Sequence, residues 1–224
     1  MRTHRAVAIL LGKELRAEFR SRELLQTTLI FALIVVVLFS FAFDPTAAES
    51  RRFGPGLLWI AFLFAGTLML NPSFAREQAN DALQGLRMAP ISAFALLLGK
   101  ILANFVFLLI AELVLLPVFA VLYNVTILPV IWRLLLVILL GTLGVVITGT
   151  VFAALASQAR MRELLLPLLL LPVLAPLLIA SVEATASLLN DEPALDPTWT
   201  VFLAAFDVVF LTASWLLCEH LMEE

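Results

Sequence analysis

Long apolar runs alternate with short polar stretches along the chain, and this alternation predicts helices that cross a membrane. The first run, about 24–43, reaches roughly 30 Å at 1.5 Å per residue, which is the thickness of a bilayer's hydrocarbon core. Five further runs follow, at about 57–70, 94–123, 130–156, 164–187 and 198–218. The pattern predicts an all-α integral membrane protein, a single domain over 1–224 with six spans between 24 and 218.

A charged segment, 1–23, precedes the first run and has its own periodicity. Its apolar positions recur every four residues at Val7, Leu11, Leu15 and Phe19, while the opposite side carries cations. This is typical of a basic amphipathic helix at an anionic membrane surface. A specific binding site is the less favoured alternative.

The longest polar interruption, 74–100, lies between the second and third spans. Ala79, Ala82, Leu83 and Leu86 fall at i, i+3, i+4 and i+7, which gives a helix one apolar stripe. The opposite face is polar and carries Glu77, Asn80, Asp81, Gln84 and Arg87. A helix this short cannot cross the bilayer, so it lies on the surface or docks into a partner.

Composition agrees with a membrane protein. Hydrophobic residues make up 62% of the chain and charged residues 14%, and the mean hydropathy is +1.07. Soluble domains carry about 25% charged residues. A single cysteine, Cys218, excludes a disulfide framework, and the two histidines, His4 and His220, lie too near the ends for a histidine-based metal or haem site inside the membrane.

The cations predict the orientation. If the N-terminus is cytoplasmic, only Arg51, Arg52 and Arg133 of the 14 lysines and arginines fall on the outer side. The positive-inside rule therefore places both termini, and the segment 76–90, in the cytoplasm.

Several enzyme motifs are absent from the sequence. No GxxxxGK[ST] phosphate-binding loop occurs, because Gly12-Lys13 and Gly99-Lys100 lack its other residues. HExxH, Gly-x-Ser-x-Gly and CxxC are also missing, and nothing supports nucleic-acid binding. The chain is expected to be a non-catalytic subunit with no catalytic, metal or cofactor-binding residues of its own.

Polar residues inside the spans are candidate functional residues: Asn104, Glu112 and Asp207. A carboxyl group there costs about 2.5 to 3.5 kcal/mol on insertion scales, so it needs a partner or a proton. No lysine or arginine lies at a matching depth, so we expect hydrogen bonds to Thr148, Thr150, Thr212 or Ser214, or protonation. A polar path or subunit contact and simple interhelical stapling are both open.

Other span residues predict packing. Gly141, Gly144 and Thr148 share one face and predict close approach of a neighbouring helix. Prolines in the fifth span favour a kink, which is either mobile or static. The tryptophans at predicted outer span ends are interpreted as interfacial belt residues, with haem stacking a minor alternative, and they are Trp59, Trp132 and Trp199.

Several short motifs resemble one known family, the heme exporter protein B family (CcmB) of cytochrome c maturation. In the first half they are Pro55-Gly56-Leu57-Leu58-Trp59, Phe74, Arg76-Glu77, Leu83, Gly85-Leu86, Ala89-Pro90, Gly99-Lys100 and Asn104. In the second half they are Leu139-Leu140-Gly141-Thr142, Arg160, Arg162, Leu171-Pro172 and Pro176-Leu177-Leu178-Ile179. The resemblance covers essentially the whole chain.

The resemblance implies a permease subunit of a type-2 ABC exporter in the bacterial inner membrane. A separate CcmA-like subunit would bind and hydrolyse ATP, CcmC-like and CcmD-like subunits would be membrane partners, and a second permease copy is open. Haem would be a substrate rather than a cofactor of this chain. The segment 76–90 would be a coupling helix, with contacts to the ATPase from Arg76, Glu77, Asn80, Asp81, Leu83, Gln84, Leu86 and Arg87.

The transported molecule is left open by the residues. The resemblance allows haem export or ATP-driven release of a haem-loaded chaperone. The alternatives are a generic type-2 exporter of a lipid or other amphiphile, and a membrane assembly subunit that transports nothing.

Overall fold

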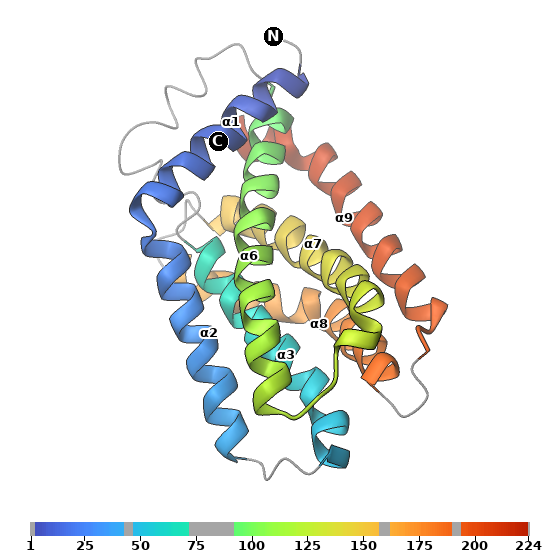
Figure 1. Ribbon diagram of the computed structural model, residues 1–224. Coiled ribbons are helices and arrows are strands. Elements are labelled where there is room, and N and C mark those ends of the chain that lie inside the picture. The colour runs from blue at the N-terminus through green and yellow to red at the C-terminus, as the bar shows by residue number, and fades with distance from the viewer. Residues whose placement is uncertain (1–2, 43–46, 72–91, 157–161, 190–193, 224) are drawn as a thin grey trace.

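The computed structural model describes residues 3–42, 47–71, 92–156, 162–189 and 194–223. These ranges are almost entirely helical and contain no strand. The helices are α1 (Thr3–Ser21), α2 (Glu23–Ala42), α3 (Ala47–Leu70), α6 (Ala93–Leu122), the 3-10 turn η1 (Leu128–Val130), α7 (Ile131–Ala156), α8 (Arg162–Leu189) and α9 (Pro197–Glu223). Figure 1 shows them as one bundle with α7 among the others.

Six helices within these ranges, α2, α3, α6, α7, α8 and α9, are long and apolar enough to cross a membrane. This confirms the prediction of an all-α protein with six spans. The main difference in boundaries lies in the second span, because α3 begins at Ala47 rather than near Leu57.

The Gly54-Pro55-Gly56 sequence, which precedes the apolar run at 57–70, is helical and lies within α3. Pro55 lacks an N–H group and therefore removes one helical hydrogen bond. A Cβ at Gly54 would lie 3.1 Å from Cζ of Phe119, a ring that is 1% exposed. The absence of a side chain at Gly54 therefore lets α3 and α6 meet closely.

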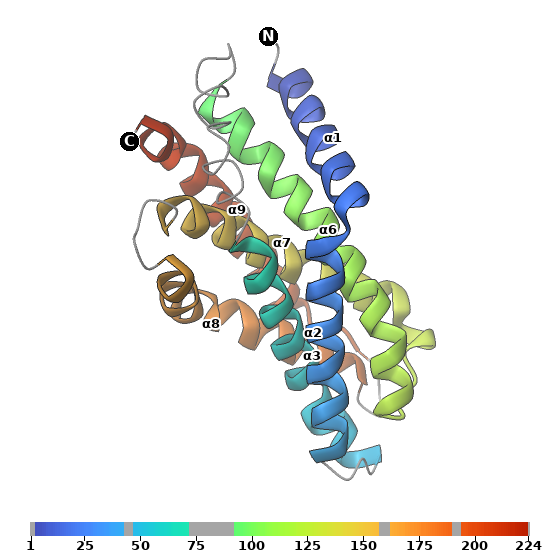
Figure 2. The same cartoon turned by 90° about the vertical axis from the view of Figure 1, so that its left-hand side faces the viewer.

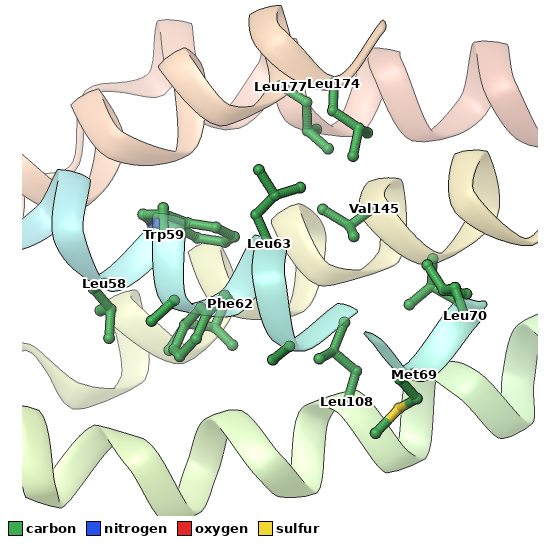
Figure 3. Packing of buried hydrophobic residues seen from close by; sticks show 14 of the residues in the cluster. Leu58, Trp59, Phe62, Leu63, Met69, Leu70, Leu108, Val145, Leu174 and Leu177 are labelled. Atoms are coloured by element: carbon green, nitrogen blue, oxygen red, sulfur yellow. The ribbon is translucent and has the colours of Figure 1, made fainter. Parts of the chain in front are cut away.

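The core forms where α7 meets α6, α8 and α9, and where α3 meets α6, α7 and α8. About three fifths of the α3 span is buried inside the bundle (61%), against 17% of the α2 span, so α3 is central and α2 peripheral. Figure 3 shows Leu63 of α3 directed toward Leu177 of α8, with Val145 of α7 beside it. Interdigitated apolar side chains thus hold the central helices together.

Small residues on α7 allow this close packing, as predicted. A Cβ at Gly141 would overlap the indole of Trp59 on α3, and a Cβ at Gly144 would lie 2.8 Å from a Leu177 methyl carbon on α8. Where lipid removes the hydrophobic driving force between helices, such contacts supply the attraction.

The N-terminal helix α1 is present, but its apolar face packs against protein. Ala6, Val7 and Leu10 are 2 to 8% exposed, and the first two cluster with Ala95 of α6. Over its first half, the apolar face of α1 therefore contacts α6. Whether its cationic side contacts the membrane stays a prediction.

Candidate functional site

Two pairs of polar side chains connect α6 and α7. The amide of Asn104 donates to Oγ1 of Thr150 at 3.2 Å, and the hydroxyl of Thr142 donates to Oε2 of Glu112 at 2.5 Å. The members of each pair come from antiparallel helices, since residue numbers rise along α6 as they fall along α7. Glu112 lies eight residues after Asn104 and Thr142 eight before Thr150, so the pairs lie about two turns apart.

Glu112 is 1% exposed, and its partner differs from the hydroxyls that were expected. Thr150 bonds Asn104 instead, and the 1%-exposed hydroxyl of Thr148 has no hydrogen-bond partner within the described ranges. The antiparallel alignment explains the error, because it places Thr142 opposite Glu112. The matching eight-residue spacing of polar residues in the two spans was the sequence signal that could have revealed it.

Asp207 is 6% exposed on α9, and neither carboxyl oxygen has a hydrogen-bond partner among the residues that the structure describes. Its Oδ1 would lie 2.8 Å from a Cβ at Gly144, so the carboxyl group packs on the bare backbone of α7. The expected hydroxyl partners are wrong here too. Thr212 and Ser214 donate to backbone carbonyls of their own helix, at 2.7 and 2.6 Å.

The carboxyl groups of Glu112 and Asp207 do not share one site. Glu112 meets Thr142 and Asp207 meets Gly144, and two residues along an α-helix turn its direction by about 200°. Glu112 therefore contacts the side of α7 that is turned toward α6, whereas Asp207 contacts the side that is turned toward α9. A third carboxyl group of the spans, Glu183 on α8, was missed by the sequence reasoning and is exposed on the outside of the bundle.

Trp59 is a core residue rather than a belt residue. It is 1% exposed, and its Nε1–H donates to Oγ1 of Thr185 on α8 at 2.9 Å. The belt prediction is wrong for this residue, and in this conformation no ligand can stack on its ring. Trp132 is 82% exposed at the start of α7, and its belt role, like that of Trp199, stays a prediction.

A charged cluster lies between α1 and α6, and sequence reasoning missed it. Lys100 is 3% exposed, and its Nζ lies 3.7 Å from Oε1 of Glu14. Glu18, 4% exposed, accepts a hydrogen bond from the backbone N–H of Leu25 at 2.9 Å. The signal was available, because Glu14 and Glu18 continue the buried face of α1 at four-residue spacing.

The predicted coupling residues lie outside the described residues, and so does Arg160. They are Arg76, Glu77, Asn80, Asp81, Leu83, Gln84, Leu86 and Arg87. The structure describes the helices on either side, α3 up to Leu70 and α6 from Ala93. Within the described ranges, no group of three or more His, Cys, Asp or Glu side chains could hold a metal ion.

Comparison with known proteins gives a consistent result. The family model described as "CcmB protein" matches residues 5–221. "Heme exporter protein B" of Pseudomonas aeruginosa is 34% identical over 188 residues, 83% of either chain. Proteins of the same name from Rhodobacter capsulatus and Paracoccus denitrificans are 35% and 32% identical, over 78% and 90% of this chain and 79% and 91% of theirs.

Proposed function

Because the chain belongs to the CcmB protein family, we propose that it is the permease subunit of an ABC transporter that handles haem for the biogenesis of c-type cytochromes. The observation that carries the proposal is the family match over 5–221. This range includes the six helices of the described residues that are able to span a membrane. Its relatives are named heme exporters.

ATP hydrolysis is assigned to a separate, CcmA-like subunit. The sequence has no phosphate-binding loop, so an ATP-driven role requires another chain. The amphipathic segment 76–90 is the proposed docking element, through helix-in-groove contact with the ATPase. Its position between α3 and α6 would let movement of the ATPase tilt both helices.

Crosslinking tests the docking. A photocrosslinker at Gln84, on the polar face of the segment, is expected to capture the ATPase subunit in the assembled complex. A crosslinker at Trp132, which is exposed at the start of α7 and on the opposite side in the proposed orientation, is the control. Capture from neither position in an active complex would count against coupling through 76–90.

The proposed location is the bacterial inner membrane with both termini in the cytoplasm, from the distribution of cations. Single cysteines at Ser50 and at Gln84 test it in a Cys218→Ser background, with an impermeant reagent on intact cells. Labelling at Ser50 and protection at Gln84 support the orientation. The reverse pattern would overturn it.

Two roles for the ATP-driven step remain to be separated, export of haem and release of a haem-loaded chaperone from a CcmC-like and CcmD-like membrane assembly. The chain's own residues favour release. Its histidines are His4 and His220 at the two ends, and the ring of Trp59 is enclosed by the bundle. Haem would then be held mainly by a partner subunit.

Reconstitution of the purified complex in vesicles distinguishes these roles. ATP-dependent release of the chaperone without haem movement would support release. ATP-dependent accumulation of haem inside vesicles would support export, and accumulation of a lipid instead would favour a generic exporter.

A further inference from the structure

Helix α1 lies parallel to α6 over about three turns. Leu10 of α1 meets Gly99 of α6, where a Cβ would lie 2.9 Å from Cβ of Leu10. Farther along, the ring of Phe19 meets the edge of Phe107 with centroids 6.2 Å apart. Figure 2 shows α1 and α2, both blue, following one another beside the green α6. The N-terminal half of α6 is therefore fitted against α1.

An ion pair between a buried lysine and a partly exposed glutamate connects the two helices. Lys100 of α6 is enclosed, with 4% of its side chain exposed, and its Nζ lies 3.7 Å from Oε1 of Glu14. Lys13 approaches the same oxygen at 3.4 Å, but it belongs to α1 itself and its side chain is 48% exposed. Of these two contacts, that of Lys100 joins two helices. The burial of Lys100, beside a Glu14 side chain that is 27% exposed, shields the pair in part from screening by salt.

The junction between α1 and α2 is short and is held by a hydrogen bond between the two helices. A single residue, Arg22, separates them with φ of 57°, in the left-handed region. The carboxylate of Glu18 in α1 accepts from the N–H of Leu25, a donor in the first turn of α2 that the helix itself leaves unsatisfied. The last turn of α1 thus caps the first turn of α2, and the two helices cannot reorient without breaking that bond.

The far end of α2 is also held to α6, because the hydroxyl of Tyr123 donates to the carbonyl of Val36 at 3.2 Å. We propose that α1 carries movement of α6 to α2, and that Lys100 and Glu14 are the positioning residues of this link. The inference rests on the proposed function, in which the ATPase acts on the segment that directly precedes α6. It assigns a mechanical role to the charges of Lys100 and Glu14.

The link itself is tested in the isolated chain in lipid nanodiscs. Spin labels replace the exposed Ile9 of α1 and Val121 of α6, in a Cys218→Ser background. We expect one narrow distance distribution in the parent, its loss in Lys100→Met, and no change in Lys13→Met, the matched control.

The exchange Glu14→Lys with Lys100→Glu is expected to restore the narrow distribution. The link would be contradicted if Lys100→Met kept the narrow distance distribution. It would also be contradicted if the narrow distribution were lost in Lys13→Met but not in Lys100→Met. To separate loss of the link from misfolding, each variant is compared with the parent by size-exclusion elution volume and by helicity from circular dichroism. A Lys100→Arg variant keeps the charge and should give the same distance distribution as the parent.

Transmission is tested in the assembled complex with and without a non-hydrolysable ATP analogue. We expect the distance between labels at Ile9 and Val121 to stay constant, while the distance from a label at the exposed Leu38 of α2 to one at the exposed Val209 of α9 changes. In Lys100→Met the second change should be lost although the ATPase still hydrolyses ATP.

A nucleotide-dependent change between Ile9 and Val121 in the parent would overturn the proposal, as would an unaltered response in Lys100→Met. If the nucleotide analogue changes no distance in the parent complex, the result contradicts the proposed function rather than the link. The two can be told apart because the nanodisc measurement tests the link in the absence of the ATPase.

Discussion

Gly141→Ala is the sharpest test of the packing around α7. The new Cβ would overlap Trp59, lying 2.7 Å from Cζ3, and would lie 2.8 Å from Oγ of Ser181. Neither neighbour can easily move. The indole N–H donates to Thr185 at 2.9 Å, and the Ser181 hydroxyl donates to the carbonyl of Leu177 at 2.8 Å.

The expected loss of stability follows from this rigidity. Adding a methylene to a well-packed core costs about 1–3 kcal/mol, and two hydrogen-bonded neighbours place this site near the upper end. Alanine is favoured over glycine by about 1 kcal/mol in a soluble helix, but a helix in lipid stays formed, so this gain is smaller. The net loss is about 2–3 kcal/mol, which corresponds to a fall in Tm of roughly 4–12 °C for a chain of this length.

Thermal denaturation of the purified protein in detergent measures this change. Gly56→Ala in α3 is the matched control, because a Cβ there meets nothing within 4 Å. Trp59→Phe removes the ring atoms in the way, so Gly141→Ala should cost less in that background. Equal Tm values for Gly141→Ala and Gly56→Ala would refute the reasoning.

Three further predictions concern the buried polar residues. In a double-mutant cycle, Asn104→Leu and Thr150→Val should be coupled by about 0.6 kcal/mol, and additive losses of stability would contradict the hydrogen bond. Glu112→Gln keeps an acceptor for its partner hydroxyl, so Tm should hold while ATP-driven activity in vesicles falls; unchanged activity would remove Glu112 from the mechanism. Asp207→Val replaces an unpaired buried carboxyl group with apolar atoms of similar volume, so the free energy of unfolding should rise by about 1–3 kcal/mol and Tm should rise with it. A lower Tm would show that the carboxyl group has a partner.

The architecture could be predicted from sequence because each span carries its own signal. Long apolar runs report insertion into lipid whatever their neighbours are, and that information is local. The small residues Gly141 and Gly144 likewise predicted close helix contact, because only helix approach gives such residues an advantage in lipid.

Partners between helices were less predictable, because they depend on alignment. Glu112 was assigned the wrong hydroxyls since a slide of one helix by one turn changes every pair. Trp59 was taken as interfacial from its place near the end of a run, but α3 begins several residues earlier than the run suggests, which moves Trp59 into the helix and into the core. For Asp207 the prediction failed for a different reason, because a sequence does not reveal that a buried polar group has no hydrogen-bond partner.

The alignment of α1 and α2 with α6 also constrains how the protein is made. Leu10 meets Gly99 and Val36 meets Tyr123, so each contact joins residues about 88 positions apart in the chain. At a synthesis rate of about 5–20 residues per second, α6 leaves the ribosome roughly 4–18 s after its partner helices. During that interval α2 must remain in the bilayer without α6, which its nearly uninterrupted apolar sequence permits. The buried face of α1, with its two carboxylates, stays uncovered until then, so α1 is the element most dependent on prompt insertion of the third span.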